Sequence, residues 1–167
     1  MKKLIFVNGT MGVGKTATCE KLLDILRPGV FLDGDWCWNM QPFTVNHETK
    51  EMVLNNISFL LNSFLKCSEY DYIIFCWVMH EEEILTDILD RLDTAEAKIF
   101  KFTLIAGKEA LSKRISNDVA AGRREKDSLE RSLERTALYD KMNTMKIDVS
   151  EISPERAARL IADLVNR

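Results

Sequence analysis

A phosphate-binding motif stands close to the first residue of the chain. Residues 9–16 read Gly-Thr-Met-Gly-Val-Gly-Lys-Thr and match the pattern G-x-x-x-x-G-K-[ST] without a gap. Glycines at these positions let the backbone curl, so that successive N–H groups point at phosphate oxygens. In such a loop Lys15 contacts the β- and γ-phosphates, and Thr16 offers its hydroxyl to Mg²⁺. The motif therefore predicts binding of a nucleoside triphosphate.

The residues around the motif favour the same interpretation. An apolar stretch, residues 4–7, comes directly before it, and an amphipathic run follows, as expected for a strand, a loop and a helix. The N-terminal end of that helix would add a partial positive charge beside the phosphates. We expect ATP and Mg²⁺ as cofactors. The predicted nucleotide-binding residues of the loop are Gly9, Thr10, Met11, Gly12, Val13, Gly14, Lys15, Thr16 and Ala17.

A competing interpretation uses part of the same residues. Residues 12–17 also read G-x-G-x-x-A, and Asp33 lies about 20 residues further on, as a dinucleotide-binding fold requires. That pattern leaves Lys15 and Thr16 unexplained. A chain of 167 residues also lacks room for the separate substrate domain that a dehydrogenase usually carries. The triphosphate interpretation is therefore favoured.

Two carboxylates follow the second apolar stretch of the chain. Asp33 and Asp35 flank Gly34 directly after residues 30–32, which are predicted as a strand. A turn would explain one aspartate but not both. No carboxylate stands at residues 78–80, after the third predicted strand, so a carboxylate near Mg²⁺ must come from elsewhere. We expect the two aspartates to lie beside the phosphate loop and to serve the metal ion or a phosphoryl acceptor.

Predicted strands and helices alternate along the whole chain. Apolar runs predict strands at residues 4–7, 30–32, 72–78, 99–105 and 146–149. Helical spacing predicts a long helix over about residues 47–66, and a capping box from Asp127 to Glu130 predicts the start of a later one. Parallel strands need helical crossovers, so the prediction is an α/β three-layer sandwich around a parallel five-stranded sheet. Ligands in such folds lie at the carboxyl ends of the strands.

Length and composition limit the remaining possibilities. With 167 residues, of which 46% are hydrophobic, residues 1–167 are expected to form a single domain. The net charge of −3 gives no general attraction to nucleic acid or to an anionic membrane. The opening residues are interpreted as a strand and not as a signal peptide, and no stretch approaches the ~20 apolar residues of a membrane span. We therefore expect a cytoplasmic protein.

The order of these features resembles a known group of enzymes. The phosphate loop, the segment Phe31 to Asp35, a long helix, a buried third strand and the segment Leu111 to Ile115 together resemble the small P-loop kinases related to adenylate kinase. The most similar types are shikimate kinase, gluconate kinase and the antibiotic phosphotransferases. The resemblance implies a P-loop NTPase fold of the nucleoside monophosphate kinase type. It also implies that Asp35 is the candidate base at the acceptor hydroxyl and that Asp33 is its partner in the metal and substrate region, and the opposite assignment of the two aspartates stays open.

The segment after the aspartates departs from gluconate kinase. Residues 36–39 read Trp-Cys-Trp-Asn in place of a polar substrate segment, and no shikimate-type arginine set is evident. Trp36 and Trp38 are instead candidates for the wall of an acceptor pocket. Trp77, within a predicted strand, is expected in the core. His80, at the end of that strand, is a candidate substrate contact.

The same resemblance implies a mobile lid at about residues 116–128. Small residues and a glycine stand next to paired arginines there, which suits a segment that closes over phosphates. The residues that resemble lid arginines are Arg114, Arg123 and Arg124. The alternative is an ordinary solvated run of charges. Arg131 and Arg135 either act with this set or pair with neighbouring glutamates, and the loop at residues 150–153 resembles the place where related kinases rest the adenine ring.

These features together predict an ATP- and Mg²⁺-dependent phosphotransferase that acts on a hydroxyl of a small molecule. A nucleoside or nucleotide kinase is the near alternative, and a non-catalytic ATP-binding regulator is the distant one. We expect a monomer or homodimer without a nucleic-acid or membrane partner. The predicted catalytic residues are Lys15, Asp33, Asp35, Arg123 and Arg124, the predicted metal ligands are Thr16 and Asp33, and Arg114 joins the nucleotide-binding set.

Overall fold

The five apolar segments predicted as strands pair in one sheet. The computed structural model describes residues 1–123 and 127–167. All paired strands are parallel, in the order β2-β3-β1-β4-β5. The strands are β1 (Lys2–Gly9), β2 (Gly29–Asp33), β3 (Tyr72–Cys76), β4 (Ala97–Ile105) and β5 (Met145–Asp148). The predicted parallel five-stranded sheet is confirmed, with the phosphate motif at the carboxyl end of its central strand.

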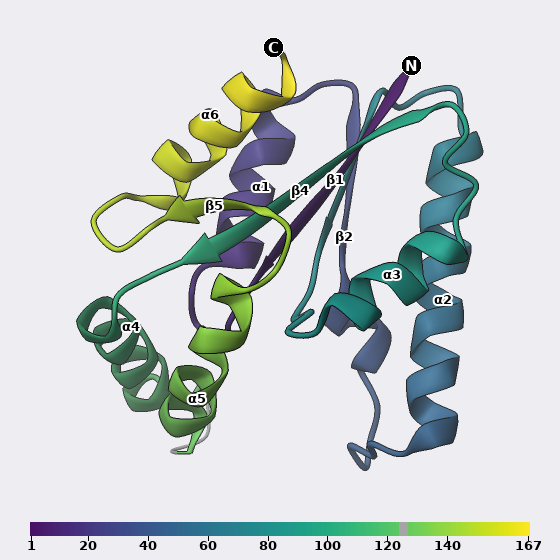
Figure 1. The fold of residues 1–167 in the computed structure, drawn as a ribbon. Helices are drawn as coiled ribbons and strands as arrows, with labels where there is room; N and C mark the ends of the chain where they lie inside the picture. Colours follow the sequence, from purple (N-terminus) through teal and green to yellow (C-terminus); the bar gives the residue numbers. More distant parts are fainter. Residues whose placement is uncertain (124–126) are drawn as a thin grey trace.

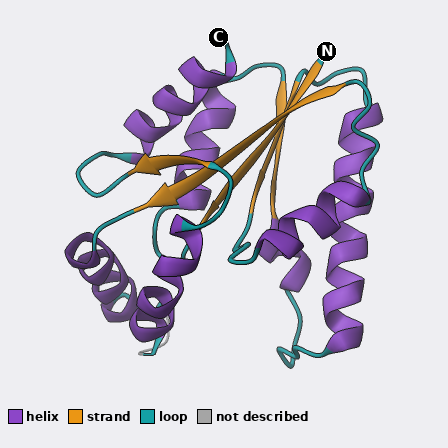
Figure 2. Cartoon of the chain, in the orientation of Figure 1, coloured by secondary structure: helices purple, strands orange, loops and turns teal. Residues whose placement is uncertain are grey.

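Helices cover both faces of this sheet. Figures 1 and 2 show α1 and α6 on one face and α2 and α3 on the other, while α4 and α5 lie beyond the carboxyl end of β4. The helices are α1 (Lys15–Ile25), the short 3-10 helix η1 (Gly34–Trp38), α2 (His47–Lys66), α3 (Glu82–Asp90), α4 (Lys108–Ala120), α5 (Ser128–Asp140) and α6 (Pro154–Val165). In the part of the chain that is described, no helix has the length and apolar character needed to cross a membrane.

Alternation along the strands divides the core into two layers. Ile74 of β3 packs in the layer with α1 and α6, and Phe75, the next residue, packs in the layer with α2 and α3. Successive side chains of a strand point to opposite faces, and both faces here are covered. The near-continuous apolar run of β3 follows directly from this double coverage.

Local sequence explains where two of the helices begin. Asn46 accepts a hydrogen bond from the Thr49 amide at 2.9 Å, and the Thr49 hydroxyl accepts one from the Asn46 amide, so a capping box opens α2. Ser153 caps α6, and Pro154 occupies its first turn, where its missing N–H is not needed. The start of α2 agrees with the helix predicted over about residues 47–66.

Helix α5 begins at Ser128 with Asp127 as its N-cap, as the sequence predicts, but the predicted cap and one predicted strand boundary are wrong. The capping box at Asp127 does not form, because Asp127 has helical backbone angles and no side-chain cap bond, and its carboxylate instead accepts from Arg131 at 3.0 Å. A capping side chain reaches the first-turn amides from an extended backbone, which Asp127 lacks. The third strand ends at Cys76 and not at Val78. Trp77 therefore lies in the loop at the carboxyl edge of the sheet.

Candidate active site

The phosphate loop connects β1 to α1 with a backbone that glycine permits. Gly12 and Gly14 have positive φ angles of 80° and 105°. A Cβ atom on Gly12 would also lie 2.5 Å from the Ile115 side chain, so α4 packs directly against the loop. Gly14 forms the N-cap of α1 without a side-chain cap bond. The first amides of α1 are therefore available for an anion at the positive end of the helix.

Lys15 bends back over this loop. Its ammonium donates to the Gly9 carbonyl at 2.9 Å and to the Thr10 carbonyl at 3.1 Å. Both acceptors belong to the loop itself, so the charge is held above the curve in which phosphate oxygens bind in motifs of this kind. Lys15 thus lies at the loop, while its contact with the phosphates stays a prediction.

Thr16 and Asp33 lie side by side across the loop. The Thr16 hydroxyl donates to Asp33 Oδ2 at 2.6 Å, and Asp33 Oδ1 accepts from the Asp35 amide at 3.0 Å. Asp33 is only 5% exposed, and these two hydrogen bonds fix both oxygens of its carboxylate. A hydroxyl and a carboxylate in contact are oxygen ligands of the kind that Mg²⁺ takes from proteins, with phosphates and water completing its shell. The two predicted metal ligands are therefore brought together.

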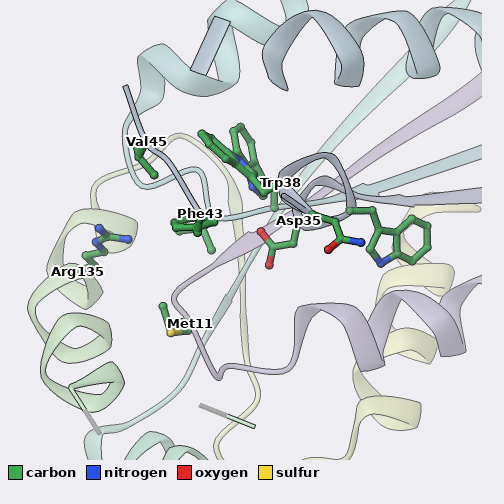
Figure 3. Close-up of a pocket in the computed structure, with 10 residues that line it drawn as sticks. Met11, Asp35, Trp38, Phe43, Val45 and Arg135 are labelled. Atoms are coloured by element: carbon green, nitrogen blue, oxygen red, sulfur yellow. The ribbon is translucent and has the colours of Figure 1, made fainter. Parts of the chain in front are cut away.

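Two cavities meet at Asp35. The first, which we call the phosphate cleft, has a volume of about 660 Å³. It is lined by Met11, Gly12, Gly14, Lys15, Thr16, Ala17, Glu20, Asp33, Asp35, Val78, Asp118 and Arg123. The second, which we call the aromatic pocket, has a volume of about 690 Å³ and is lined by Met11, Asp35, Trp36, Trp38, Asn39, Phe43, Val45, Trp77, Val78 and Arg135 (Figure 3). Of the carboxylates that line either cavity in the described residues, Asp35 alone borders both.

Aromatic side chains form much of the second cavity. Trp36 and Trp38 line it, and the rings of Trp38 and Phe43 approach to 5.7 Å between centroids. Trp77 was expected in the core, and it does pack on the α2 and α3 layer, but it also forms a wall of the pocket. Its ring stands so close to Gly34 that a Cβ atom there would lie 2.5 Å from Trp77 Cγ. Gly34, between the two aspartates, thus packs directly against the Trp77 ring.

Arg114 connects two loops at the carboxyl edge of the sheet. It lies on α4 and donates to the Val13 carbonyl at 3.1 Å and to the Val149 carbonyl, so it joins the phosphate loop to the loop after β5. A small cavity of about 130 Å³ adjoins this contact and includes Gly14 and Ser153. The loop after β5 is itself ordered by the Ser150 hydroxyl and amide, whose hydrogen bonds lower the pKa of Asp148. Arg114 therefore faces the predicted adenine side of the loop.

The predicted lid is described only in part. Residues 116–120 form the end of α4, and α5 begins at Ser128. Arg123 borders the phosphate cleft, where its guanidinium contacts Asp118 at 3.1 Å and its side chain remains 68% exposed. Arg124 lies outside the described residues. Arg123 thus lies at the rim of the phosphate cleft, while its contact with phosphates and the closure of a lid stay predictions.

Sequence reasoning missed a serine that anchors α5. The buried Ser132 donates its hydroxyl hydrogen to the Met11 carbonyl at 2.7 Å, and the Thr10 hydroxyl donates to the Ser132 carbonyl at 2.8 Å. Helix α5 is thereby fastened to the phosphate loop. Ser128, Ser132 and Tyr139 are buried at helical spacing, and this small polar stripe was the available indication.

Arg135, three residues after Ser132 on α5, lines the aromatic pocket. Among the described contacts, neither Arg131 nor Arg135 pairs with Glu130 or Glu134, the alternative that the sequence leaves open. Arg131 pairs with Asp127 at 3.0 Å, and Arg135 points to the cavity because it lies on the side of α5 that faces the loop.

His80 lines a further cavity, which we call the side cavity and which adjoins the aromatic pocket. The side cavity shares Trp38, Trp77 and Arg135 with that pocket. His80 Nδ1 is buried without a hydrogen-bond partner among the described residues, and Nε2 lies 3.8 Å from Glu81. Burial lowers the pKa of His80, and the nearby charge of Arg135 lowers it further. Both effects favour the neutral form of His80, which borders the predicted substrate region.

Comparison with known proteins agrees with this architecture. No curated protein sequence matches significantly. The tunicamycin resistance protein of Deinococcus radiodurans superposes with a TM-score of 0.69 at 17% identity, covering 99% of this chain and 96% of that chain. A gluconokinase from Sinorhizobium meliloti 1021 gives 0.69 at 16% identity, with 98% and 94% covered. Shikimate kinase from Acinetobacter baumannii gives 0.63 at 16% identity, with 99% and 94% covered.

These likenesses confirm the fold that the resemblance to small P-loop kinases implied. The family model described as AAA domain, AAA_18, matches residues 5–136. That match spans the phosphate loop, both aspartates and the anchoring serine of α5. Because the matched region is most of the chain, this protein belongs to the AAA_18 family.

Proposed function

We propose that this protein is a phosphotransferase that moves the γ-phosphoryl group of ATP to a hydroxyl of a small molecule. The observation that carries the proposal is the place of Asp35, on the border between the phosphate cleft and the aromatic pocket. A carboxylate at such a junction can orient an acceptor hydroxyl and take its proton. Residues 1–167 would act as one catalytic domain, and the shared fold with proteins named as kinases supports this assignment.

The two aspartates would divide the work. Asp33 is fixed by Thr16 and by the Asp35 amide, an arrangement suited to a metal shell and unsuited to proton transfer. Asp35 would receive the hydroxyl proton as the acceptor oxygen bonds to the γ-phosphorus and the bond from that phosphorus to the bridging oxygen of ADP breaks. Mg²⁺, held by Thr16 and Asp33 together with phosphate oxygens, would neutralise charge on the triphosphate.

The remaining residues would bind and position the nucleotide. Lys15 and the loop amides would hold the β- and γ-phosphates, and Arg123 would add charge from the rim of the cleft. Arg114 would fix the phosphate loop against the loop after β5, where the adenine is expected. Each of these groups would act on the triphosphate, so the aromatic pocket remains as the binding site for the acceptor.

A second candidate is a nucleoside or nucleotide kinase. The paired rings of Trp38 and Phe43 give a surface on which a nucleobase could stack. A non-catalytic ATP-binding regulator is the third, and it would leave the junction at Asp35 without a chemical use.

The test is a broad acceptor screen coupled to ADP detection, with nucleosides and nucleotides as one arm. Acceptor-dependent ADP release is expected, and Asp35→Asn should lower kcat by ~10² to 10⁴ with little change in ATP binding. Asp24→Asn, in an exposed ion pair on α1, is the matched control and should behave as the parent protein. ATP binding without turnover on any acceptor would favour the regulator. Equal kcat for Asp35→Asn and the parent protein would remove the proposed base.

A further inference from the structure

The aromatic pocket contains a single cation among its described lining residues, Arg135. Arg135 is half-buried, and within the described part of the chain no hydrogen bond or ion pair joins its guanidinium to another residue. A guanidinium next to apolar walls is partly deprived of water, so an anionic partner there is bound more strongly than at an exposed site. The pocket therefore offers a place for one negative charge.

The position of this charge is set by the anchor of α5. Ser132 is fastened to Met11 and Thr10 of the phosphate loop, and Arg135 follows less than one turn later on the same side of the helix. Figure 3 shows Arg135 and Asp35 on different sides of the pocket, with Phe43 between them. A ligand that met both would span the cavity. Its hydroxyl would lie at Asp35, and its anionic group would lie at Arg135.

The walls between these two groups favour a flat, apolar body. Trp38 and Phe43 face the cavity with their rings 5.7 Å apart between centroids, and Trp77 closes a further side. Asn39 is the only uncharged polar side chain among the described lining residues. A sugar or polyol would leave most of its hydroxyl groups without partners here, whereas a planar ring system would bury apolar surface.

The side cavity does not offer a better anion site. It contains Lys50 and His80, but also the carboxylates of Glu81 and Asp87. An acid group that moved into it would meet negative as well as positive charge. In the aromatic pocket the other charged lining residue is Asp35, at the hydroxyl end. The strongest position for an acid group is therefore the wall that Arg135 forms.

We propose that the acceptor is a planar, largely apolar molecule with one carboxylate group, and that Arg135 binds this carboxylate. A guanidinium suits a carboxylate because two parallel N–H groups meet its two oxygens. The inference rests on the proposed phosphotransfer in one respect, because that function assigns the hydroxyl end of the acceptor to Asp35.

Calorimetric binding to the full chain, with Mg²⁺ and a non-hydrolysable ATP analogue present, tests the proposal without turnover. Three probes separate its parts: a hydroxymethyl naphthoate, the corresponding naphthamide, and ω-hydroxyoctanoate as an aliphatic acid of similar length. The naphthoate should bind at least about tenfold more tightly than either of the others, a difference of about 1.4 kcal/mol. Equal binding of acid and amide, or no binding of the naphthoate at millimolar concentration, overturns the proposal. Equal binding of naphthoate and aliphatic acid overturns the planar body.

Arg135→Gln should remove the preference for the naphthoate over the naphthamide and leave the affinity for the naphthamide within about twofold, because only the charge contact is lost. Arg131→Gln is the matched control, since Arg131 lies on the same helix and pairs with Asp127. It should keep the preference, and a preference that survives in Arg135→Gln overturns the assignment.

Turnover of the same probes separates this inference from the proposed function. Arg135-dependent binding of the naphthoate without ADP release would contradict the phosphotransfer and keep the anion site. Phosphorylation of neutral acceptors with no preference for an acid group would support the phosphotransfer and contradict the anion site.

Discussion

The Thr16 hydroxyl and the Asp33 carboxylate meet at 2.6 Å, although the two residues belong to different strand-to-helix connections. Thr16 lies in the first turn of α1, and Asp33 is the last residue of β2. All carboxyl ends of a parallel sheet lie at one edge, so the two connections meet there although β3 lies between β1 and β2. The contact joins the two oxygen atoms that we assign to Mg²⁺.

The hydroxyl of Thr16 should be needed for metal use. Thr16→Ala should raise the Mg²⁺ concentration required for half-maximal turnover about tenfold or more, because a neutral ligand to the metal is lost. Thr16→Ser retains the hydroxyl and should stay close to the parent protein. The measurement is kcat as a function of free Mg²⁺ at saturating ATP. Identical Mg²⁺ curves for the alanine and serine variants would exclude this role.

Lys15→Ala should lower phosphoryl transfer by ~10² to 10³, because a preorganised charge contact with the phosphates is removed. The fold should remain, since Lys15 donates to carbonyls of the loop and fills no core position. Lys21→Ala on the same helix, where Lys21 lies 4.0 Å from Glu155 on the surface, is the control. Thermal unfolding and steady-state kinetics of both variants check the prediction. Near-normal turnover in Lys15→Ala would contradict the phosphate-loop assignment.

Arg123→Ala should lower kcat far more than it weakens ATP binding, if the lid closes only when both substrates are bound. A transition-state arginine is worth ~10³ to 10⁵ in rate, whereas an exposed ion pair contributes ~0 to 1 kcal/mol. Arg27→Ala is a matched control, because Arg27 is 73% exposed in its side chain and pairs with Asp24 at 3.6 Å. The same comparison applies to Arg124→Ala. If Arg123→Ala and Arg27→Ala have the same kcat, the ion pair with Asp118 is only a surface contact.

His80 should make the folded protein less stable in mild acid. Its pKa is lowered by burial and by Arg135, so the unfolded chain takes up a proton more readily than the folded chain as the pH falls through the ordinary histidine value of about 6.5. The free energy of unfolding should therefore decrease below that pH. His80→Gln should remove this decrease, whereas His47→Gln, at an exposed position, should not. Urea unfolding across the pH range measures the effect, and an unchanged pH profile in His80→Gln would contradict it.

Arg135→Gln offers a separate check on the same group. Because the charge of Arg135 opposes protonation of His80, its removal should raise the His80 pKa toward the ordinary value. An NMR titration of the imidazole measures this shift directly. No change in the titration would mean that burial alone lowers the pKa.

The phosphate loop, the sheet and the aspartate pair could be predicted because their information is local. The spacing of Gly12, Lys15 and Thr16 is contained in eight consecutive residues, and strand alternation is a property of short windows. The meeting of Thr16 with Asp33 then follows from the rule that ligand-binding loops gather at one edge of a parallel sheet. Local pattern and topology together were sufficient for the nucleotide side of the site.

The acceptor side could not be predicted in the same way. The pocket position of Arg135 depends on the bond between Ser132 and Met11, which are 121 residues apart. The helical spacing of Ser128, Ser132 and Tyr139 indicates a buried face of α5, but it does not identify the distant carbonyl to which Ser132 bonds. The capping box at Asp127 failed for a related reason, since the backbone there is helical where a cap needs an extended residue.

The bond between Ser132 and the Met11 carbonyl has a consequence for how the two substrates bind. Met11 borders both cavities, so a movement of its backbone when the triphosphate enters must either carry Ser132 with it or break a 2.7 Å hydrogen bond. Arg135 lies within one turn of Ser132 on α5, so it would move together with Ser132. If entry of the triphosphate moves Arg135 in this way, then by thermodynamic reciprocity each ligand alters the affinity for the other by the same factor. The Ser132 hydroxyl would in that case couple the two substrates through the scaffold and not through the chemistry.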